Sequence, residues 1–369
     1  MPKIFSFASI NIDEVYSVPH IVCPGETLTS TRRQQHAGGK GTNASIAAAR
    51  SGHSHVTVIG KIGPDGLWIR TLIESTGANI DHITVLEKTP TGRAIIQVDD
   101  AGENAIFLFP GANHMLTQDD ARKALAVSSS EGDWLLLTNE TTAVVEAMRM
   151  AKDVGMQVLW NPAPVDSRVV ANGLVDVLVV NESELAEIAR QQKGKEADGG
   201  GLGDCAKLAR QVMLWMDCHV IAVTLGSKGS LGLVRRSRLN THEITIHATE
   251  DNNSNSDSSS SSDDDIVEVR MACAPVGKDQ VKDTTGAGDT WVGYFAAELA
   301  RKQGDSPESI GSAVTSLTPS MVEHAMRVAT YASGLAVTQM GAVTSIPHRA
   351  QVDEFLKTKK AIQNNPKIK

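Results

Sequence analysis

The segment Asp283-Thr-Thr-Gly-Ala-Gly-Asp289 places a carboxylate directly after a glycine-rich turn. Residues 290–300 have the apolar spacing of a helix, so the turn Gly286-Ala287-Gly288 is predicted to lie at a helix N-terminus. Unpaired N–H groups and the helix dipole bind anions there, and glycine lets a phosphate approach the backbone closely. A carboxylate repels an anion, so Asp289 is suited to accept the proton of a hydroxyl beside a transferring phosphoryl group. The alternative is an ordinary helix start, because Asp is a favoured N-cap residue.

A second glycine-rich loop, Ala37-Gly-Gly-Lys-Gly-Thr-Asn43, also precedes a segment of helical composition, residues 44–50. It offers Lys40 and Asn43 as hydrogen-bond donors. It is not a P-loop, because Gly41 stands where that motif needs Ser or Thr. The loop is therefore either a ligand site or a tight turn with a solvated lysine.

Polar residues also follow the predicted strands. Asn11 and Asp13 come after the first strand, residues 4–10, and alternate residues of an extended segment share a face. An amide and a carboxylate together suit neighbouring sugar hydroxyls, which both donate and accept; a turn cap is the alternative. Ligands of open α/β sheets bind beyond the carboxyl ends of strands. Later strands end in the same way, at Asn139-Glu140, Asn181-Glu-Ser-Glu184 and Thr224-Leu-Gly-Ser-Lys-Gly229.

The elements that must position these residues form an α/β pattern. After residue 130, strand-like runs alternate with helical stretches such as 141–152 and 182–191. The strand-like runs are 134–138, 157–161, 175–181 and 220–224. This alternation predicts a mainly parallel sheet with helices on both faces. Residues 27–35 and 91–109 alternate polar and apolar side chains, which predicts a smaller, more exposed sheet: either a lid over the site or two peripheral hairpins.

Composition limits the partners and the compartment. The net charge of −8 disfavours nucleic acid. The cysteines at 23, 205, 218 and 273 form no C-x-x-C pair, which argues against a disulfide framework or a zinc site and fits a reducing compartment. The N-terminus does not resemble a signal peptide, and no apolar run approaches the ~20 residues that span a bilayer. We therefore expect a cytoplasmic protein, or one that is also nuclear, with no membrane partner.

One stretch, residues 251–265, contains only Asp, Asn and Ser and cannot contribute to a core. It lies between two alternating segments, 243–247 and 266–270, and is predicted to be a disordered extension of a hairpin turn. The serines at 260–262 each have an aspartate three residues downstream, a pattern that acidophilic protein kinases accept. An inert linker is the alternative.

Taken together, these segments resemble the ribokinase family of carbohydrate kinases, also called the PfkB family. Residues 38–43 are similar to its N-terminal signature and residues 283–289 to its C-terminal one. The likeness runs from about residue 4 to Pro347, interrupted by the serine-rich insert. Within the family the chain is most similar to the members that phosphorylate ribose, in the segments Asn11-x-Asp13, Gly102-Glu-Asn104, Gly111-Ala-Asn113, Asn161-Pro-Ala-Pro164 and Asn181-Glu-Ser-Glu184.

The resemblance implies a three-layer α/β/α core with a mainly parallel sheet and a small β-sheet lid. The kinase domain would cover residues 1–350, with lid strands at about 12–36 and 91–113, followed by a C-terminal helix and tail at 351–369. The small-molecule ligands would be a sugar and ATP, with Mg²⁺, and K⁺ as a monovalent activator. A homodimer formed through the lids is also implied.

The resemblance also assigns roles to residues at matching positions. Asp289 would be the base, and the anion hole would be Gly286, Ala287 and Gly288. With Asp289, the sugar would be held by Asn11, Asp13, Gly39, Lys40, Asn43 and Glu140. The nucleotide would contact Asn181, Glu184, Thr224, Leu225, Gly226, Ser227, Lys228, Gly229, Gly288 and Thr330. The monovalent cation would lie among Asp283, Thr285, Ala336, Gln339, Gly341 and Ser345, several of them through backbone carbonyls.

The implied reaction is transfer of the ATP γ-phosphoryl group to O5 of D-ribose. Phosphorylation of a ketose, a sugar acid or a nucleoside is the alternative, and a catalytically inactive sugar-binding regulator is another. Arg93 stands where the ribose kinases usually have a small apolar residue. It is either directed at the sugar, favouring a different or phosphorylated substrate, or a solvated arginine of the lid. Thr330 replaces an Asn that is usual near the adenine.

Overall fold

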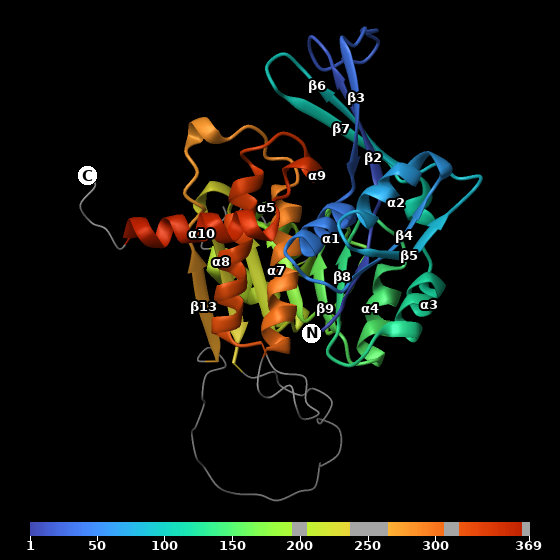
Figure 1. The fold of residues 1–369 in the computed structure, drawn as a ribbon. Coiled ribbons are helices and arrows are strands. Elements are labelled where there is room, and N and C mark those ends of the chain that lie inside the picture. The colour runs from blue at the N-terminus through green and yellow to red at the C-terminus, as the bar shows by residue number, and fades with distance from the viewer. Residues whose placement is uncertain (194–204, 237–264, 306–316, 364–369) are drawn as a thin grey trace, which may run out of the picture.

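The large sheet has nine strands within the part of the chain that this computed structural model describes, residues 1–193, 205–236, 265–305 and 317–363. Its strand order is β13-β12-β11-β10-β9-β8-β1-β4-β5, and it lies at the centre of the molecule in Figure 1. The strands are β1 (Ile4–Phe7), β4 (Val56–Ile62), β5 (Asn79–Val85), β8 (Trp134–Thr138), β9 (Gln157–Asn161), β10 (Val177–Asn181), β11 (Val220–Thr224), β12 (Ser230–Arg235) and β13 (Ile266–Met271).

The sheet is mainly parallel, as the sequence predicts. The seven strands β11, β10, β9, β8, β1, β4 and β5 pair in parallel, and β12 and β13 complete one edge in antiparallel pairing. Runs such as Trp134-Leu-Leu-Leu-Thr138 are buried at every residue, as expected for strands covered by helices on both faces. Three of the predicted strands coincide with β8, β9 and β11, whereas β10 begins at Val177 rather than 175.

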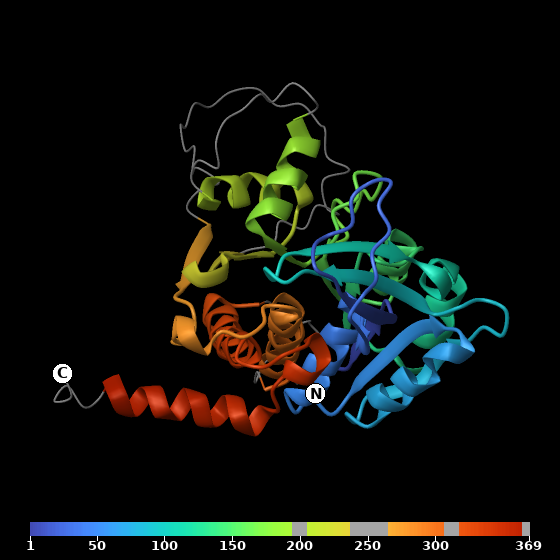
Figure 2. The same cartoon turned by 90° about the horizontal axis from the view of Figure 1, so that it is seen from above.

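Helices cover both faces of this sheet (Figures 1 and 2). Alternate strand residues face opposite layers: Trp134 and Leu136 pack into one core, and Leu135 and Leu137 into the other. The first layer contains α1 (Lys40–Arg50), α2 (Leu67–Glu74), α7 (Ala287–Gly304) and α8 (Pro319–Ala336). The second contains α3 (Gln118–Ser128), α4 (Val144–Asp153), α5 (Glu182–Lys193) and α6 (Cys205–Met216). The three-layer α/β/α core is thereby confirmed.

The chain ends in two further helices, α9 (Ala342–Ser345) and α10 (Arg349–Gln363). Helix α10 contacts α8 and extends away from the body of the molecule (Figure 2). No helix among the described residues is both long and apolar enough to cross a membrane. Several segments considered in the sequence analysis lie outside the described residues: nearly all of the serine-rich insert at 251–265 with its serines at 260–262, the segment 243–247 and the tail at 364–369. Of the two segments that flank the insert, the second forms β13, which pairs along its length with β12.

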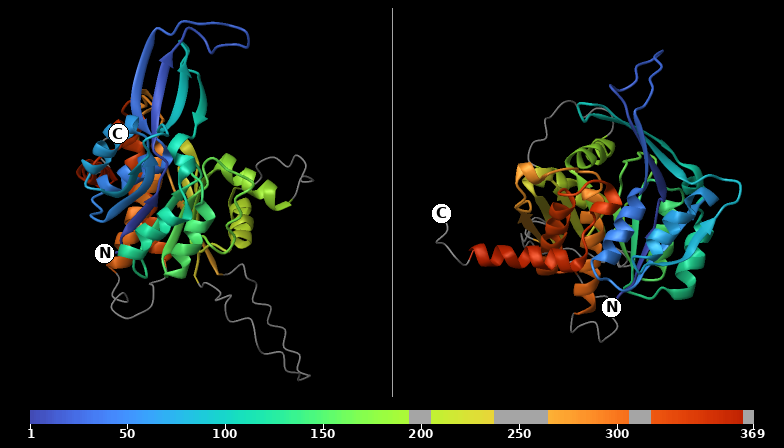
Figure 3. Two further views of the ribbon diagram at one scale, coloured as in Figure 1. Left: turned by 90° about the vertical axis from the view of Figure 1, so that its right-hand side faces the viewer. Right: turned by 45° about the horizontal axis from the view of Figure 1, so that its top comes forward.

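A smaller sheet of strand order β3-β2-β6-β7 projects from the body of the molecule, at the top of Figure 1 and of the left-hand view in Figure 3. Its strands are β2 (Asn11–Ser17), β3 (Arg32–Gly38), β6 (Gly92–Val98) and β7 (Asn104–Phe109). Strand β2 pairs in parallel with β6 and antiparallel with β3, and β6 pairs antiparallel with β7. We call this sheet the lid. The predicted small sheet is present, although β3 begins at Arg32 and the preceding residues from Thr27 are not in a strand.

Candidate active site

The two glycine-rich loops meet because α1 and α7 pack unusually closely. A Cβ atom on Gly293 of α7 would lie 2.2 Å from the carbonyl oxygen of Ala44 in α1, so only glycine fits there. The close packing brings together the first turns of the two helices. Asn43 Nδ2 donates a 2.7 Å hydrogen bond to Asp289 Oδ2. This bond holds the Asp289 carboxylate in one orientation at the N-terminus of α7.

Glu140 joins β8 to the start of α1. Its Oε2 atom accepts hydrogen bonds from Ser9 Oγ at 2.6 Å and from the backbone N–H of Lys40 at 2.9 Å. Ser9 Oγ in turn accepts from the backbone N–H of Gly41. Glu140 therefore satisfies N–H groups at the first turn of α1, where no residue of the helix itself supplies a side-chain cap. Burial raises the pKa of Glu140, although the bond from Ser9 and the charge of Lys40 oppose that shift.

Asn11 is fixed by a residue that the sequence analysis did not assign to the site. Asn113 Nδ2 donates to Asn11 Oδ1 at 2.7 Å, and Asn113 Oδ1 accepts from the backbone N–H of Ile10 at 2.9 Å. Gly92 leaves room for this pair, since a Cβ atom there would lie 2.2 Å from Asn113 Nδ2. The only sequence signal for Asn113 is its place in the segment Gly111-Ala-Asn113.

Asp13 lies in β2 and faces the other charged groups. Its pKa is raised to about 7, chiefly by burial and also by the negative charges of Glu140 and Asp289, whereas the charge of Lys40 lowers it. The pKa of Lys40 is raised chiefly by the charge of Asp289. A Cβ atom on Gly38 would lie 2.1 Å from Asp13 Oδ2, so the Asp13 carboxylate rests directly against the β3 backbone. Lys40 is thus surrounded by carboxylates that repel one another.

Asn181 and Glu184 cap α5. The backbone N–H of Glu184 donates to Asn181 Oδ1 at 2.9 Å, and that of Asn181 donates to Glu184 Oε2 at 2.8 Å. Burial raises the pKa of Glu184; the positive charge of Lys40 lowers this pKa, and the negative charge of Asp289 raises it. Lys228 forms an exposed ion pair with Glu182 at 3.1 Å.

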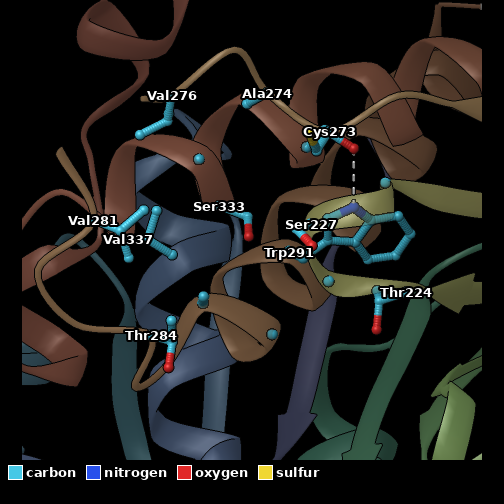
Figure 4. Close-up of a pocket in the computed structure, with 16 residues that line it drawn as sticks. Thr224, Ser227, Cys273, Ala274, Val276, Val281, Thr284, Trp291, Ser333 and Val337 are labelled. Carbon is cyan, nitrogen blue, oxygen red and sulfur yellow. Dashed lines mark hydrogen bonds between the residues drawn. The ribbon is translucent and has the colours of Figure 1, made fainter. Parts of the chain in front are cut away.

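On the other side of the Gly286-Ala287-Gly288 turn lies a cavity of about 430 Å³. Figure 4 shows its wall, which is largely apolar and contains no charged side chain. Of the residues predicted to contact a nucleotide, it is lined by Thr224, Gly226, Ser227, Gly229, Gly288 and Thr330. The remaining predicted contacts, Asn181, Glu184, Leu225 and Lys228, do not line it. The sequence analysis missed Cys273, Ala274, Val276, Val281, Thr284, Trp291, Ser333, Gly334 and Val337.

Thr330 has a partner inside this wall. Trp291 Nε1 donates to Thr330 Oγ1 at 3.3 Å, the bond drawn as a dashed line in Figure 4. Trp291 is only 3% exposed, so its indole N–H depends on this hydroxyl. No sequence pattern marked Trp291, because an aromatic residue on a helix is ordinarily part of a core.

The residues predicted to hold a monovalent cation come from the loop before α7 and from the segment that runs from the end of α8 to α9. Asp283 joins the loops: Oδ1 accepts from the backbone N–H of Thr285 at 2.9 Å and Oδ2 from that of Gly341 at 2.8 Å. The Gln339 N–H donates to the Ala336 carbonyl, and Ser345 Oγ to that of Ala342. No group of three His, Cys, Asp or Glu side chains suited to a metal ion occurs in the described parts of the chain.

Neither interpretation of Arg93 matches the structure. Its guanidinium forms ion pairs with Glu14 and with Asp65, the latter at 2.5 Å. Residues 12 and 93 are partners in the β2–β6 ladder, so Arg93 lies on the face of the lid opposite Asp13. Its side chain is 25% exposed. Arg93 is therefore neither directed toward the Asp13 face nor freely solvated.

The sequence matches a known family and several curated proteins. A model of the pfkB family of carbohydrate kinases matches residues 1–248 and 266–349. A ribokinase from Haemophilus influenzae is 31% identical over 355 residues, which cover 94% of this chain and 96% of the relative. A bifunctional ribokinase/ribose-5-phosphate isomerase A from Fructilactobacillus sanfranciscensis is 30% identical over 360 residues, 95% of this chain but only 56% of that relative.

A solved structure has the same fold. The crystal structure of a ribokinase from Cryptococcus neoformans var. grubii in complex with ADP superposes with a TM-score of 0.68 at 29% identity, covering 96% of this chain and 99% of that one. The two glycine-rich loops, the three-layer core and the family match all support the same assignment. The chain belongs to the pfkB family of carbohydrate kinases.

Proposed function

We propose that this kinase transfers the γ-phosphoryl group of ATP to O5 of D-ribose. The observation that carries the proposal is the Asp289 carboxylate, held by Asn43 at the N-terminus of α7. It lies between a cluster of polar groups suited to hydroxyls and a cavity large enough for part of a nucleotide. The ribokinase relatives support ribose as the sugar.

In this mechanism Asp289 is the general base. The bond from Asn43 occupies Oδ2 and leaves Oδ1 to accept the proton of the sugar hydroxyl. The sugar oxygen then forms a bond to the γ-phosphorus while the bond to the ADP oxygen breaks. The backbone N–H groups at Gly286, Ala287 and Gly288 stabilise the negative charge on the transferring group, since they lie at the start of α7.

The sugar hydroxyls would be held by the network built around Lys40. Asn11 and Asp13 both project from the start of β2, and Glu140 anchors the loop that carries Lys40. An ionised Asp13 accepts hydrogen bonds from two neighbouring hydroxyls. Bound Mg²⁺ would supply charge neutralisation at the phosphates, and the carboxylate of Glu184 in the first turn of α5 would help to hold it.

For K⁺, we propose the two loops joined by Asp283. Both oxygens of its carboxylate are already occupied by N–H donors, so the ion would be coordinated by carbonyls of the 283–285 and 336–341 segments. The loop 283–285 leads directly into the anion hole. Cation binding would therefore order the turn that stabilises the phosphoryl group.

We further propose a homodimer formed through the lids, in the cytoplasm. Ile106, Phe107, Leu108 and Phe109 of β7 are 44% to 59% exposed, and β7 is an edge strand of the lid. An exposed apolar edge of this kind favours association with another chain. Light scattering of the purified protein, together with a variant carrying charged residues on β7, tests the dimer.

The first experiment measures ADP release from the purified protein with Mg-ATP and a panel of ribose, 2-deoxyribose, ketoses, sugar acids and nucleosides. Turnover with D-ribose that potassium increases is expected. Turnover with another acceptor only would leave Asp289 as the proposed base and would replace ribose as the proposed substrate. Calorimetric sugar binding without any turnover would instead support an inactive sugar-binding regulator.

A further inference from the structure

Arg93 joins the lid to the core through two carboxylates. One nitrogen of its guanidinium contacts Glu14 in β2, and another contacts Asp65 in the short 3₁₀ helix η1 (Pro64–Gly66) that follows β4. The planar guanidinium has donors that diverge, so it can hold two carboxylates in a fixed relation. The side chains of Arg93, Glu14 and Asp65 are 25%, 11% and 31% exposed, so water screens the pairs only in part.

Each carboxylate also has partners of its own. Glu14 accepts hydrogen bonds from Tyr16, Gln35 and Arg33, all of them in the lid. Burial alone would raise the pKa of Glu14, but these bonds and the charge of Arg93 hold it below its usual value. Arg93 therefore connects Glu14, which other lid residues already hold in place, with Asp65, which lies outside the lid.

Asp65 is held in the same way at the base of the lid. Its Oδ1 atom accepts from the backbone N–H of Thr91 at 3.0 Å and from Thr91 Oγ1 at 2.8 Å. Thr91 Oγ1 accepts from the backbone N–H of Gly63 at 2.9 Å. Asp65 is thus held by Thr91, which is itself bonded to Gly63 after β4, and Arg93 extends this contact to Glu14 in β2.

The link bears on the sugar side because Glu14 follows Asp13. Adjacent residues of a strand point to opposite faces, so holding Glu14 from one face also fixes the peptide that carries Asp13 on the other. The Asp13 carboxylate lies in contact distance of the Gly38 backbone and has little freedom of its own. A small change in the angle of β2 would therefore move the Asp13 carboxylate relative to Lys40.

We propose that Arg93 is a positioning residue: by tying Glu14 of the lid to Asp65 of the core, it sets where Asp13 meets the sugar. The inference rests on the proposed sugar kinase activity. Arg93 does not contact the sugar in this role, because it lies on the face of the lid opposite Asp13. The bridge acts on sugar binding and leaves Asp289 and the nucleotide cavity unaffected.

The test compares Arg93→Met with a matched variant, Arg33→Met, in the full-length protein. Arg33 also contacts Glu14 but is not paired with Asp65. Arg93→Met is expected to raise KM for the sugar about tenfold, because a misplaced binding group costs affinity, with kcat within about twofold and KM for ATP unchanged. Arg33→Met is expected to change the sugar KM less than about twofold, because Glu14 keeps its link to the core.

Two further measurements separate positioning from a loss of stability. Asp65→Asn should raise the sugar KM as Arg93→Met does, and the double variant should be no worse than either, because both remove one link. The sugar KM of the wild type should rise with ionic strength, and that of Arg93→Met should not. Unchanged sugar KM in Arg93→Met, or additive effects in the double variant, would overturn the inference.

Hydrogen exchange keeps this test independent of the proposed activity. If the wild type turns over no sugar, the kinase proposal fails by itself, and the bridge is then tested on the ligand-free protein. Amides of β2 and β6 are expected to exchange faster in Arg93→Met than in the wild type or in Arg33→Met. Equal exchange in all three proteins would show that Arg93 does not hold the lid.

Discussion

The candidate site has two sides, the one proposed to bind the sugar (the sugar side) and the cavity proposed to bind the nucleotide (the nucleotide side), and they differ in what lines them. On the sugar side, charged and amide side chains hold one another: Asn43 holds Asp289, and Asn113 holds Asn11. On the nucleotide side, the cavity has an apolar wall without a charged side chain. Ligand binding on the sugar side should therefore depend on which functional groups are present, whereas binding on the nucleotide side should depend on the shape of the cavity and on its backbone groups. Substitutions that keep shape but change chemistry should therefore affect the two sides very differently.

The largest effect is expected from Asp289→Asn, which keeps the shape of the side chain and removes the base. The kcat should fall at least ~10²-fold, the lower end of general-base contributions, with little change in either KM. Steady-state kinetics on protein with unchanged circular dichroism measures this. Asp119→Asn, at an exposed carboxylate in the first turn of α3, is the matched control and should leave kcat unchanged. Full kcat in Asp289→Asn would remove Asp289 from the mechanism.

The pH dependence of sugar binding should report Asp13. Because its pKa is raised to about 7, Asp13 is largely protonated at pH 6 and largely ionised at pH 8. The ionised form accepts hydroxyl hydrogen bonds, so kcat/KM for the sugar should rise by up to ~tenfold per pH unit below the inflection near pH 7. In Asp13→Asn this inflection should disappear and the sugar KM should increase. An unchanged inflection in the variant would assign the titration to another group.

Asp13 should have the opposite effect on stability. Its pKa is higher in the folded state than the unfolded value of 3.8, so between these pH values the folded protein retains a proton that the unfolded chain has lost. The free energy of unfolding should therefore decrease as pH rises from about 4 through about 7. Asp13→Asn, which has no such charge, should lose less stability than the wild type over this range. Denaturant titrations at pH 5 and pH 8 compare the two.

The nucleotide side can be tested through Cys273, which lines the cavity. A non-hydrolysable ATP analogue at ten times its dissociation constant should slow alkylation of Cys273 about tenfold, because about one molecule in ten remains free. Ribose alone should not. Cys23 is exposed outside the cavity and serves as the internal control in the same peptide mass spectrum. Equal alkylation of Cys273 with and without the analogue would show that the nucleotide base and ribose lie elsewhere.

The same contrast explains what the sequence could predict. Lys40 and Asp289 follow glycine-rich loops and lie in the first turns of α1 and α7, where glycine and a charged side chain together are typical of an anion-binding helix start, so their types and spacing indicated a site. Ala274, Val276 and Val337 of the cavity wall are ordinary core residues by type, and their meeting depends on the packing of distant segments. The large sheet was predictable because buried parallel strands form continuous apolar runs.

The partners of lid residues were not predictable for a related reason. Arg93 and Asp65 are 28 positions apart, and Asp65 lies in a short turn with no periodic pattern. Asn113 holds Asn11 across 102 positions. Which side chains meet in such pairs depends on the register of the strands. The alternation of polar and apolar residues does not determine that register when both faces of a sheet are exposed. The sequence indicated the lid, whereas its ionic connection to the core required the structure.

The smallest effect on catalysis is expected at Thr330. Thr330→Val has nearly the same shape but removes the oxygen that accepts the hydrogen bond from Trp291 Nε1. The buried indole N–H would then lack a partner, which should lower the free energy of unfolding by about 1–3 kcal/mol. Because the cavity wall is mostly apolar and its shape is kept, KM for ATP should change less than about threefold. Thr330→Ser retains the hydroxyl and should preserve stability. If Thr330→Val instead raised KM for ATP tenfold or more without destabilising the protein, the hydroxyl would bind the nucleotide directly, and the nucleotide side would depend on functional groups as the sugar side does.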